Sequence, residues 1–215
     1  MNQLPDEAAA PPRWGYRRAA RRAGMALAAA LWLAALILGG SESGFDKTLF
    51  SALFAGDDGV LARNAALITH LGRWLVLTPL AVAVALFLVF KRRMRAALLL
   101  IIVFGGRMLV ELQKMVVDRD RPGASPWLEA QQSASFPSGH AANATITLVA
   151  IAMLLPLRQS HRALAVGIAL ALALQVGWSR IALGAHWPSD VIGGWAFGLL
   201  WVGICMRLAS DRPEA

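Results

Sequence analysis

SRIALGAHWPSD, residues 179–190, is the stretch that joins two long apolar runs and organises the rest of the chain around it. Pro188 suits the first turn of a helix, where a missing N–H does no harm, so His186 falls in the hinge before that helix. Helical side chains lean toward the N-terminus, so the Asp190 carboxylate can reach back to the imidazole. Such a pair leaves one ring nitrogen free as a nucleophile or base, and Arg180 can hold an anion beside it. The alternative interpretation is a polar cap on a membrane helix.

The composition is that of a membrane protein. Of the 215 residues, 57% are hydrophobic and 16% are charged, and the mean hydropathy is +0.54. The net charge of +8 comes from arginines in short clusters beside apolar runs, which favours contact with anionic lipid headgroups over binding of nucleic acid. Cys205 is the single cysteine and no histidine pair has metal-ligand spacing, so we expect no metal site and no cofactor.

Six apolar runs predict an all-α bundle of six transmembrane helices. The first run could instead be the core of a cleaved signal peptide, but it is longer than such cores usually are, and we interpret it as a retained span. A basic arm (residues 1–23) precedes the membrane domain (residues 24–208), and a short tail (residues 209–215) follows it. The predicted spans are Gly24–Gly40, Trp74–Phe90, Ala96–Val117, Ala141–Leu155, Ala163–Leu183 and Val191–Leu208.

Positive charge predicts the orientation of the bundle. Basic residues flank the first span and follow the second, fourth and sixth, and such residues concentrate on the cytoplasmic side. We therefore expect both termini in the cytoplasm and the remaining loops outside, in the periplasm if the membrane is a bacterial inner membrane. The basic residues are Arg17, Arg18, Arg21, Arg22, Lys91, Arg92, Arg93, Arg95, Arg158, Arg162, Arg207 and Arg212.

Residues 41–73 hold two short amphipathic patterns separated by a Gly-Asp-Asp-Gly turn at residues 56–59. They predict short interfacial helices between the first two spans. Such helices could form an entrance for lipid, or they could simply pack against the bundle.

Three polar clusters fall on the predicted outer ends of the spans. The first contains Lys114 and Arg121-Pro122, the second is Pro137–His140, and the third is residues 179–190. Cations are expected to be scarce on the outer side, so their presence there predicts an anionic ligand.

The second cluster, Pro137–His140, has the features of a phosphate cradle. A proline can open a helix, Ser138 offers a hydroxyl, and Gly139 lets a ligand approach the free N–H groups at the positive end of the helix dipole. His140 is then placed to give a proton to a leaving oxygen, as a general acid does.

In order and spacing, the three clusters resemble the three signature motifs of the type 2 phosphatidic acid phosphatase (PAP2) superfamily, which also includes the vanadium haloperoxidases. The matching positions are Lys114-x6-Arg121-Pro122, Pro137-Ser138-Gly139-His140 and Ser179-Arg180-x5-His186-x3-Asp190. Every signature position is filled, and the resemblance extends over roughly residues 69–208, with six spans as in the membrane branch of the superfamily.

The resemblance implies a role for each motif residue. His186 would attack phosphorus to form a phosphohistidine, Asp190 would orient it, and His140 would protonate the leaving group and later activate water. The phosphoryl oxygens would be bound by Lys114, Arg121, Ser138, Gly139 and Arg180, so that no metal is required.

Charged and aromatic residues near the motifs carry separate predictions. Arg107, Glu111 and Lys114 share one helix face, and an unpaired charge in a membrane is unfavourable, so we expect Glu111 to bridge the two cations. We expect Asp118, Arg119 and Asp120 to be solvated loop charges. Trp127 and Trp187 are expected to be interfacial anchors, and His70 and His161 ordinary surface residues.

The sequence thus predicts a membrane enzyme that hydrolyses a phosphomonoester or diphosphate of a lipid at the outer face. Undecaprenyl diphosphate, phosphatidylglycerophosphate and phosphatidate are candidate substrates. A phosphotransferase with the same site is a close alternative, and a vanadate-dependent haloperoxidase is disfavoured by the six spans. A lipid transporter would place charges through the depth of the membrane, whereas these lie mostly at one end. No oligomeric state is predicted.

Overall fold

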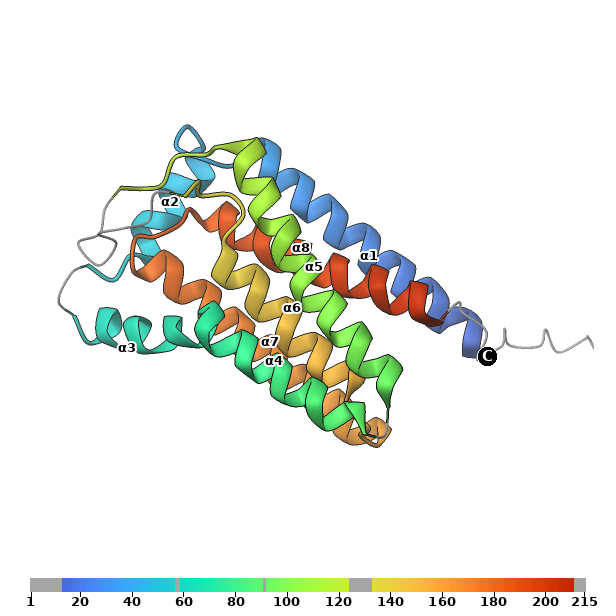
Figure 1. Cartoon of the computed structure of the whole chain (residues 1–215). Helices are drawn as coiled ribbons and strands as arrows, with labels where there is room; N and C mark the ends of the chain where they lie inside the picture. The colour runs from blue at the N-terminus through green and yellow to red at the C-terminus, as the bar shows by residue number, and fades with distance from the viewer. Residues whose placement is uncertain (1–12, 57–58, 91, 124–132, 211–215) are drawn as a thin grey trace, which may run out of the picture.

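The computed structural model describes residues 13–56, 59–90, 92–123 and 133–210. Within these ranges every regular element is a helix, and the predicted all-α class is confirmed (Figure 1). The elements are α1 (Arg13–Leu38), α2 (Gly44–Leu53), α3 (Val60–Thr69), the 3₁₀ turn η1 (His70–Gly72), α4 (Trp74–Val89), α5 (Arg93–Val117), α6 (Gly139–Leu154), α7 (Gln159–Ala182) and α8 (Pro188–Ser210).

Four helices are long and apolar enough to cross a membrane, namely α1, α5, α7 and α8. The α3–η1 segment and α4 meet at a bend of 42° and satisfy the same criteria together. Helix α6 is apolar but has 16 residues, whereas a span needs about 20. The described residues therefore contain four spans, or five if the bent pair is one, and the count of six stays a prediction.

The basic turns lie at one end of the bundle. The start of α1, the end of α8, the α4–α5 turn and the α6–α7 turn all lie toward the right of Figure 1. Arg95 of α5 donates a hydrogen bond of 3.3 Å to the carbonyl oxygen of Leu154, which caps the end of α6. Helix α1 begins at Arg13, so the described part of the predicted basic arm continues directly into the first span.

Helix α6 lies at the centre of the core and packs against α5, α7 and α8. Small residues let α8 approach it closely. A Cβ atom on Gly198 would lie 2.8 Å from Cβ of Thr145, and one on Gly194 would lie 2.8 Å from the carbonyl oxygen of Ser138. The second contact brings the start of α6 against the second turn of α8, and with it two of the predicted motifs.

Helices α2 and α3 occupy the two predicted amphipathic segments. Phe50 and Leu53 of α2 pack against α7 and α8, and the Phe50 ring lies 5.4 Å from that of Trp187. Phe45 is 55% exposed, so only part of the apolar pattern is buried by packing. The buried residue of α2 is Asp46, whose carboxylate the apolar pattern did not predict to be inside.

Candidate active site

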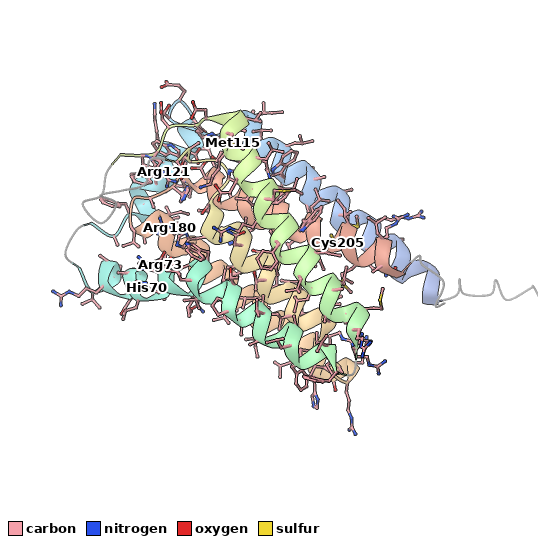
Figure 2. All side chains as sticks on the ribbon, in the orientation of Figure 1. His70, Arg73, Met115, Arg121, Arg180 and Cys205 are labelled. Atoms are coloured by element: carbon pink, nitrogen blue, oxygen red, sulfur yellow. The ribbon has the colours of Figure 1, made fainter. Side chains whose placement is uncertain are left out.

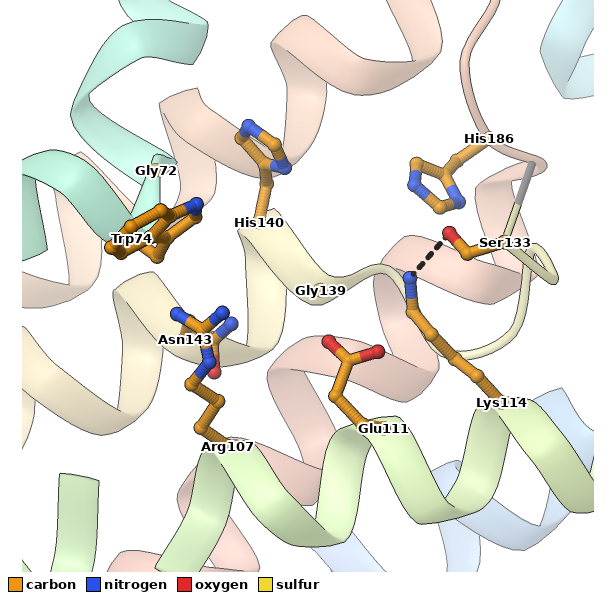
Figure 3. A pocket seen from close by; sticks show the side chains of 10 residues that line it. All are labelled: Gly72, Trp74, Arg107, Glu111, Lys114, Ser133, Gly139, His140, Asn143 and His186. Atoms are coloured by element: carbon orange, nitrogen blue, oxygen red, sulfur yellow. Dashed lines mark hydrogen bonds between the residues drawn. The ribbon is translucent and has the colours of Figure 1, made fainter. Parts of the chain in front are cut away.

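A cavity of about 430 Å³ lies where α5 ends and α6 begins. Four predicted site residues line it: Lys114, Gly139, His140 and His186. In Figure 3 the two imidazoles face the cavity from α6 and from the α7–α8 turn, opposite the side chains of α5. The structure thus brings the two histidines to one cavity, as the motif spacing predicted. Its other lining residues are Gly72, Trp74, Arg107, Glu111, Ser133 and Asn143.

His186 lies in the turn between α7 and α8, beside the first turn of α8. Its Nδ1 is 3.6 Å from Oδ2 of Asp190, and Oγ of Ser135 lies 3.3 Å from the same nitrogen. Ser135 donates a short hydrogen bond to Oδ2 of Asp190, and the backbone N–H of Trp187 donates another of 2.9 Å. The carboxylate is therefore fixed next to the ring on its Nδ1 side.

Arg121 defines the other side of the His186 ring. Its guanidinium lies 3.1 Å from Nε2, and because a guanidinium can only donate, Nε2 must be the acceptor. The proton of a neutral ring is then on Nδ1, facing Ser135 and Asp190. Burial lowers the pKa of His186 well below its usual 6.5, and the charges of Arg121 and Arg180 lower it further. His186 is therefore neutral, with its lone pair on Nε2.

The predicted phosphate-binding cations surround this ring. Lys114 donates to Oγ of Ser133 over 3.3 Å, and Arg121 donates to the carbonyl oxygen of Ala185 over 2.8 Å. Arg180 is buried and donates to Oγ1 of Thr69 over 2.9 Å. Figure 2 shows Arg121 and Arg180 at the same end of the bundle, away from Cys205. Arg121, Arg180 and Asp190 are not among the residues that line the cavity, but Arg121 and Asp190 contact the His186 ring, which does line it.

The start of α6 supplies polar groups that point toward the same region. Ser138 is the N-cap residue, and its backbone N–H donates to the carbonyl oxygen of Asp190 over 2.9 Å. Its hydroxyl is buried and has no hydrogen-bond partner among the described residues. A Cβ on Gly139 would lie 3.7 Å from Nζ of Lys114, so the backbone comes close to a cation here. The arrangement suits binding of an anion at a helix N-terminus.

Comparison with known proteins identifies the family. Residues 95–214 match the PAP2 superfamily. The chain belongs to the PAP2 superfamily. It is 40% identical to phosphatidylglycerophosphatase B of Bacillus subtilis over 138 residues, which cover 62% of this chain and 68% of that protein. It is 31% identical to an undecaprenyl-diphosphatase of Sulfolobus acidocaldarius over 185 residues, which cover 82% of this chain and 85% of the relative.

A solved PAP2 structure has the same fold. The crystal structure of a transmembrane PAP2-type phosphatidylglycerolphosphate phosphatase from Bacillus subtilis superposes with a TM-score of 0.76 at 29% identity. The match covers 90% of this chain and 98% of that one. The predicted family and the predicted helical membrane architecture are thus confirmed.

One charge beside the first PAP2 motif was predicted wrongly. Asp118 and Asp120 are exposed, as expected for loop charges, but Arg119 is not. Only 9% of its side chain is exposed, and its guanidinium donates to Oδ1 of Asp190 over 2.9 Å. The sequence did not predict this contact, because it does not show whether the side chain of a loop arginine points into the protein or into solvent.

Two further site residues also lack a sequence signal. Ser135 lies just before the second motif, and Thr69 lies in the predicted interfacial segment. Both are small hydroxyl residues that become informative only once the helices bring them beside His186 and Arg180.

Two predictions about neighbouring side chains were also wrong. Trp187 is 8% exposed and its indole N–H donates to the carbonyl oxygen of Asp120 over 3.0 Å, so it is a packed residue and not an interfacial anchor. Glu111 does not bridge Arg107 and Lys114, since no ion pair within 4.0 Å joins it to either of these described residues. Arg107 instead stacks on Trp74, 5.3 Å from the ring centre.

The remaining predictions concern surface and metal-binding residues. His70 and His161 are exposed, as predicted, whereas Trp127 lies outside the described residues. Within the described part of the chain, no three His, Cys, Asp or Glu side chains gather in a way that could hold a metal ion.

Proposed function

We propose that this chain hydrolyses a phosphomonoester or diphosphate bond of a lipid through a phosphohistidine on His186. The observation that carries the proposal is the shared cavity: His186, His140 and Lys114 all line it, at one end of a bundle of apolar helices. A nucleophile, a general acid and a cation at one cavity are the parts that phosphoryl transfer requires. The names of the relatives, phosphatidylglycerophosphatase and undecaprenyl-diphosphatase, support lipid phosphates as the substrate class.

In the proposed first step, Nε2 of His186 attacks phosphorus and the bond from phosphorus to the leaving oxygen breaks. His140, which is protonated when the negative phosphoryl group is bound beside it, gives its proton to that oxygen. Asp190 and Ser135 hold the Nδ1–H of the ring as positive charge develops on the imidazole. The phosphoryl oxygens are bound by the cations and by the start of α6, where Ser138 and Gly139 lie, in place of a metal ion.

In the second step, neutral His140 accepts a proton from water as the water attacks the phosphohistidine. The bond between phosphorus and Nε2 breaks, inorganic phosphate leaves, and His186 regains its lone pair. A phosphotransferase would differ only in this step, because a lipid or sugar hydroxyl would replace the water. Analysis of the products separates the two, since only hydrolysis releases inorganic phosphate.

We further propose that the site faces the periplasm from a bacterial inner membrane, with both termini in the cytoplasm. The support is the separation of charge: the α4–α5 turn, with its arginines at 92, 93 and 95, and the α6–α7 turn, with Arg158, lie at the opposite end of the bundle from the α7–α8 turn that contains His186. A reporter fused after residue 215 should therefore behave as cytoplasmic. A periplasmic result would invert the proposed topology.

The proposal is tested by phosphate release from a panel of lipid phosphates in the presence of a chelator. The panel contains phosphatidylglycerophosphate, undecaprenyl diphosphate and phosphatidate, with wild type and His186→Ala compared. We expect wild-type turnover that the chelator does not reduce and that His186→Ala abolishes while the protein remains folded. Retained turnover in His186→Ala would remove the proposed nucleophile.

A further inference from the structure

A chain of buried polar side chains lies behind the His186–Asp190 pair, on the side away from the cavity. At its centre, the Arg119 guanidinium donates to Oδ1 of Asp190 over 2.9 Å and to Oγ of Ser189 over 3.1 Å. It also donates to the carbonyl oxygens at the end of α1, in residues 35–36, over 3.1 and 2.7 Å. One face of the guanidinium covers the ring of Phe136 at 4.6 Å. The guanidinium is thus held by several partners at once.

Asp46 of α2 continues the chain beyond Ser189. Its fully buried carboxylate accepts hydrogen bonds from the backbone N–H of Ser189 over 2.8 Å, from Oγ of Ser189 over 2.6 Å and from the N–H of Gly40 over 2.6 Å. The Ser189 hydroxyl therefore donates to Asp46 and accepts from Arg119. The order of contacts is Asp46, Ser189, Arg119, Asp190, His186.

The two oxygens of Asp190 have different partners. Oδ2 faces the His186 ring and accepts from Ser135 and from the Trp187 backbone, whereas Oδ1 accepts from Arg119. The Arg119 guanidinium donates to Asp190, to Ser189 and to the end of α1, so its donors are used on the Oδ1 side of Asp190, away from His186, and it is not placed to touch a substrate. Its contact with Oδ1 fixes the rotation of the carboxylate, and this rotation decides whether Oδ2 points at Nδ1 of His186.

We propose that Arg119 is a positioning residue for the His186–Asp190 pair and that Asp46, acting through Ser189, holds Arg119 in place. The inference rests on the function proposed above. It assigns a role to the corner between α1 and α2, which contains no signature motif. A planar guanidinium is suited to this role because it can donate to Asp190, Ser189 and the α1 carbonyls in fixed directions at once.

The corner itself is shaped to allow these contacts. A Cβ on Gly39 would overlap the side chain of Ser189, and Gly40 has φ +118°, a conformation that glycine adopts readily. The two glycines therefore let the chain turn directly over Ser189 and point the Gly40 N–H at Asp46. This explains, in terms of packing, why the glycine pair at residues 39–40 is followed by a buried carboxylate at Asp46.

The test measures kcat and KM for phosphate release by full-length protein with the best lipid phosphate of the panel. The variants are Arg119→Gln, Arg119→Lys and Ser189→Ala, with Arg93→Gln as the control because Arg93 is exposed at the other end of α5. We expect kcat to fall about 100-fold in Arg119→Gln with KM within about twofold of wild type, as for residues that orient a reacting group from behind. Arg119→Lys should have a kcat about tenfold higher than that of Arg119→Gln, because lysine keeps the positive charge but lacks the planar guanidinium.

Ser189→Ala separates positioning from folding, because it removes one buried hydroxyl and leaves both charges in place. We expect kcat to fall about threefold to tenfold per folded molecule, KM to be unchanged, and Arg93→Gln to match wild type. Unchanged kcat in both Ser189→Ala and Arg119→Lys would overturn the inference, even if Arg119→Gln fails to fold. A rise in KM at constant kcat would overturn it as well, since it would make Arg119 a substrate contact. Folded wild type that releases no phosphate from any lipid would overturn the proposed function and this inference with it.

Discussion

Arg121 donates to Nε2 of His186, the nitrogen on the opposite side of the ring from Asp190, over 3.1 Å. The contact requires the lone pair of the neutral ring to be on Nε2, which is the nitrogen that would attack phosphorus. It also places a guanidinium directly beside that nitrogen. In the proposed mechanism, Arg121 exchanges the ring nitrogen for a phosphoryl oxygen when substrate binds, which frees Nε2 to attack phosphorus.

This contact predicts the effect of removing the Arg121 guanidinium. Arg121→Gln should lower kcat/KM by about 10²–10³-fold, the usual loss when a donor to developing negative charge is removed. Orthovanadate, which resembles the five-coordinate phosphorus of the transition state, should inhibit the variant more weakly than wild type. Equal inhibition of both proteins by orthovanadate would show that Arg121 does not bind the phosphoryl oxygens.

Ser135 predicts a second kinetic effect. Its hydroxyl lies between Nδ1 of His186 and Oδ2 of Asp190, so Ser135→Ala leaves the ring with the 3.6 Å contact to Asp190 alone. We expect kcat to fall about tenfold, with KM little changed, because the partner of a reacting histidine is lost while the substrate contacts remain. Ser133→Ala is the matched control for a neighbouring serine on the cavity wall; it should alter KM more than kcat.

The low pKa of His186 predicts how stability depends on pH. Unfolding returns the ring to an ordinary pKa near 6.5, so below that pH the unfolded chain binds a proton that the folded chain does not. Above about pH 6.5 the ring is neutral in both states and does not change the free energy of unfolding. Below that pH, His186 lowers the free energy of unfolding progressively, by up to about 1.4 kcal/mol per pH unit. Thermal unfolding in detergent at pH 7.5 and 5.0 should show a smaller acid shift of Tm for His186→Gln than for wild type. An equal acid shift of Tm in the two proteins would contradict the lowered pKa of His186.

Packing of α8 on α6 predicts a stability effect that is separate from the chemistry. A Cβ on Gly198 would lie 2.8 Å from Cβ of Thr145, so Gly198→Ala should lower the free energy of unfolding by about 1–3 kcal/mol through overpacking. A Cβ on Gly167 of α7 would have no atom of the described residues within 4 Å, so Gly167→Ala should be neutral or stabilise by up to about 1 kcal/mol. Opposite signs of the two shifts in Tm are expected; a destabilisation shared by both would contradict the packing argument.

The fold and the motif positions could be predicted from the sequence because their signals are local. The apolar runs predicted the long helices, and Pro188 predicted the start of α8. The spacing of His186 and Asp190 gave a contact within one helical turn. The same rules did not settle the number of spans, because α6 and α4 each have only 16 residues and α3 bends into α4.

The residues behind the site could not be predicted, because their partners are distant in the sequence. Asp46 and Ser189 are 143 positions apart, and Arg119 and Asp190 are 71 apart. The motif marked Arg121 as a site residue and left Arg119 as a loop charge, and only the packing shows that Arg119 is bound to a buried carboxylate. The predicted Glu111 bridge was wrong for a related reason: helix spacing brought Arg107, Glu111 and Lys114 to one face, but Trp74 of α4 offers Arg107 a cation–π contact instead.

The central claim, that His186 carries the phosphoryl group during turnover, is tested most directly by trapping the intermediate. Wild type and His140→Asn are mixed with lipid substrate labelled with ³²P in the scissile phosphate, quenched with alkali within the first turnover, and digested for peptide mapping. We predict label on the peptide that contains His186, more of it in His140→Asn because water activation is slowed, and none in His186→Ala. Label on any other residue, or phosphate release by His186→Ala at the wild-type rate, would contradict the account.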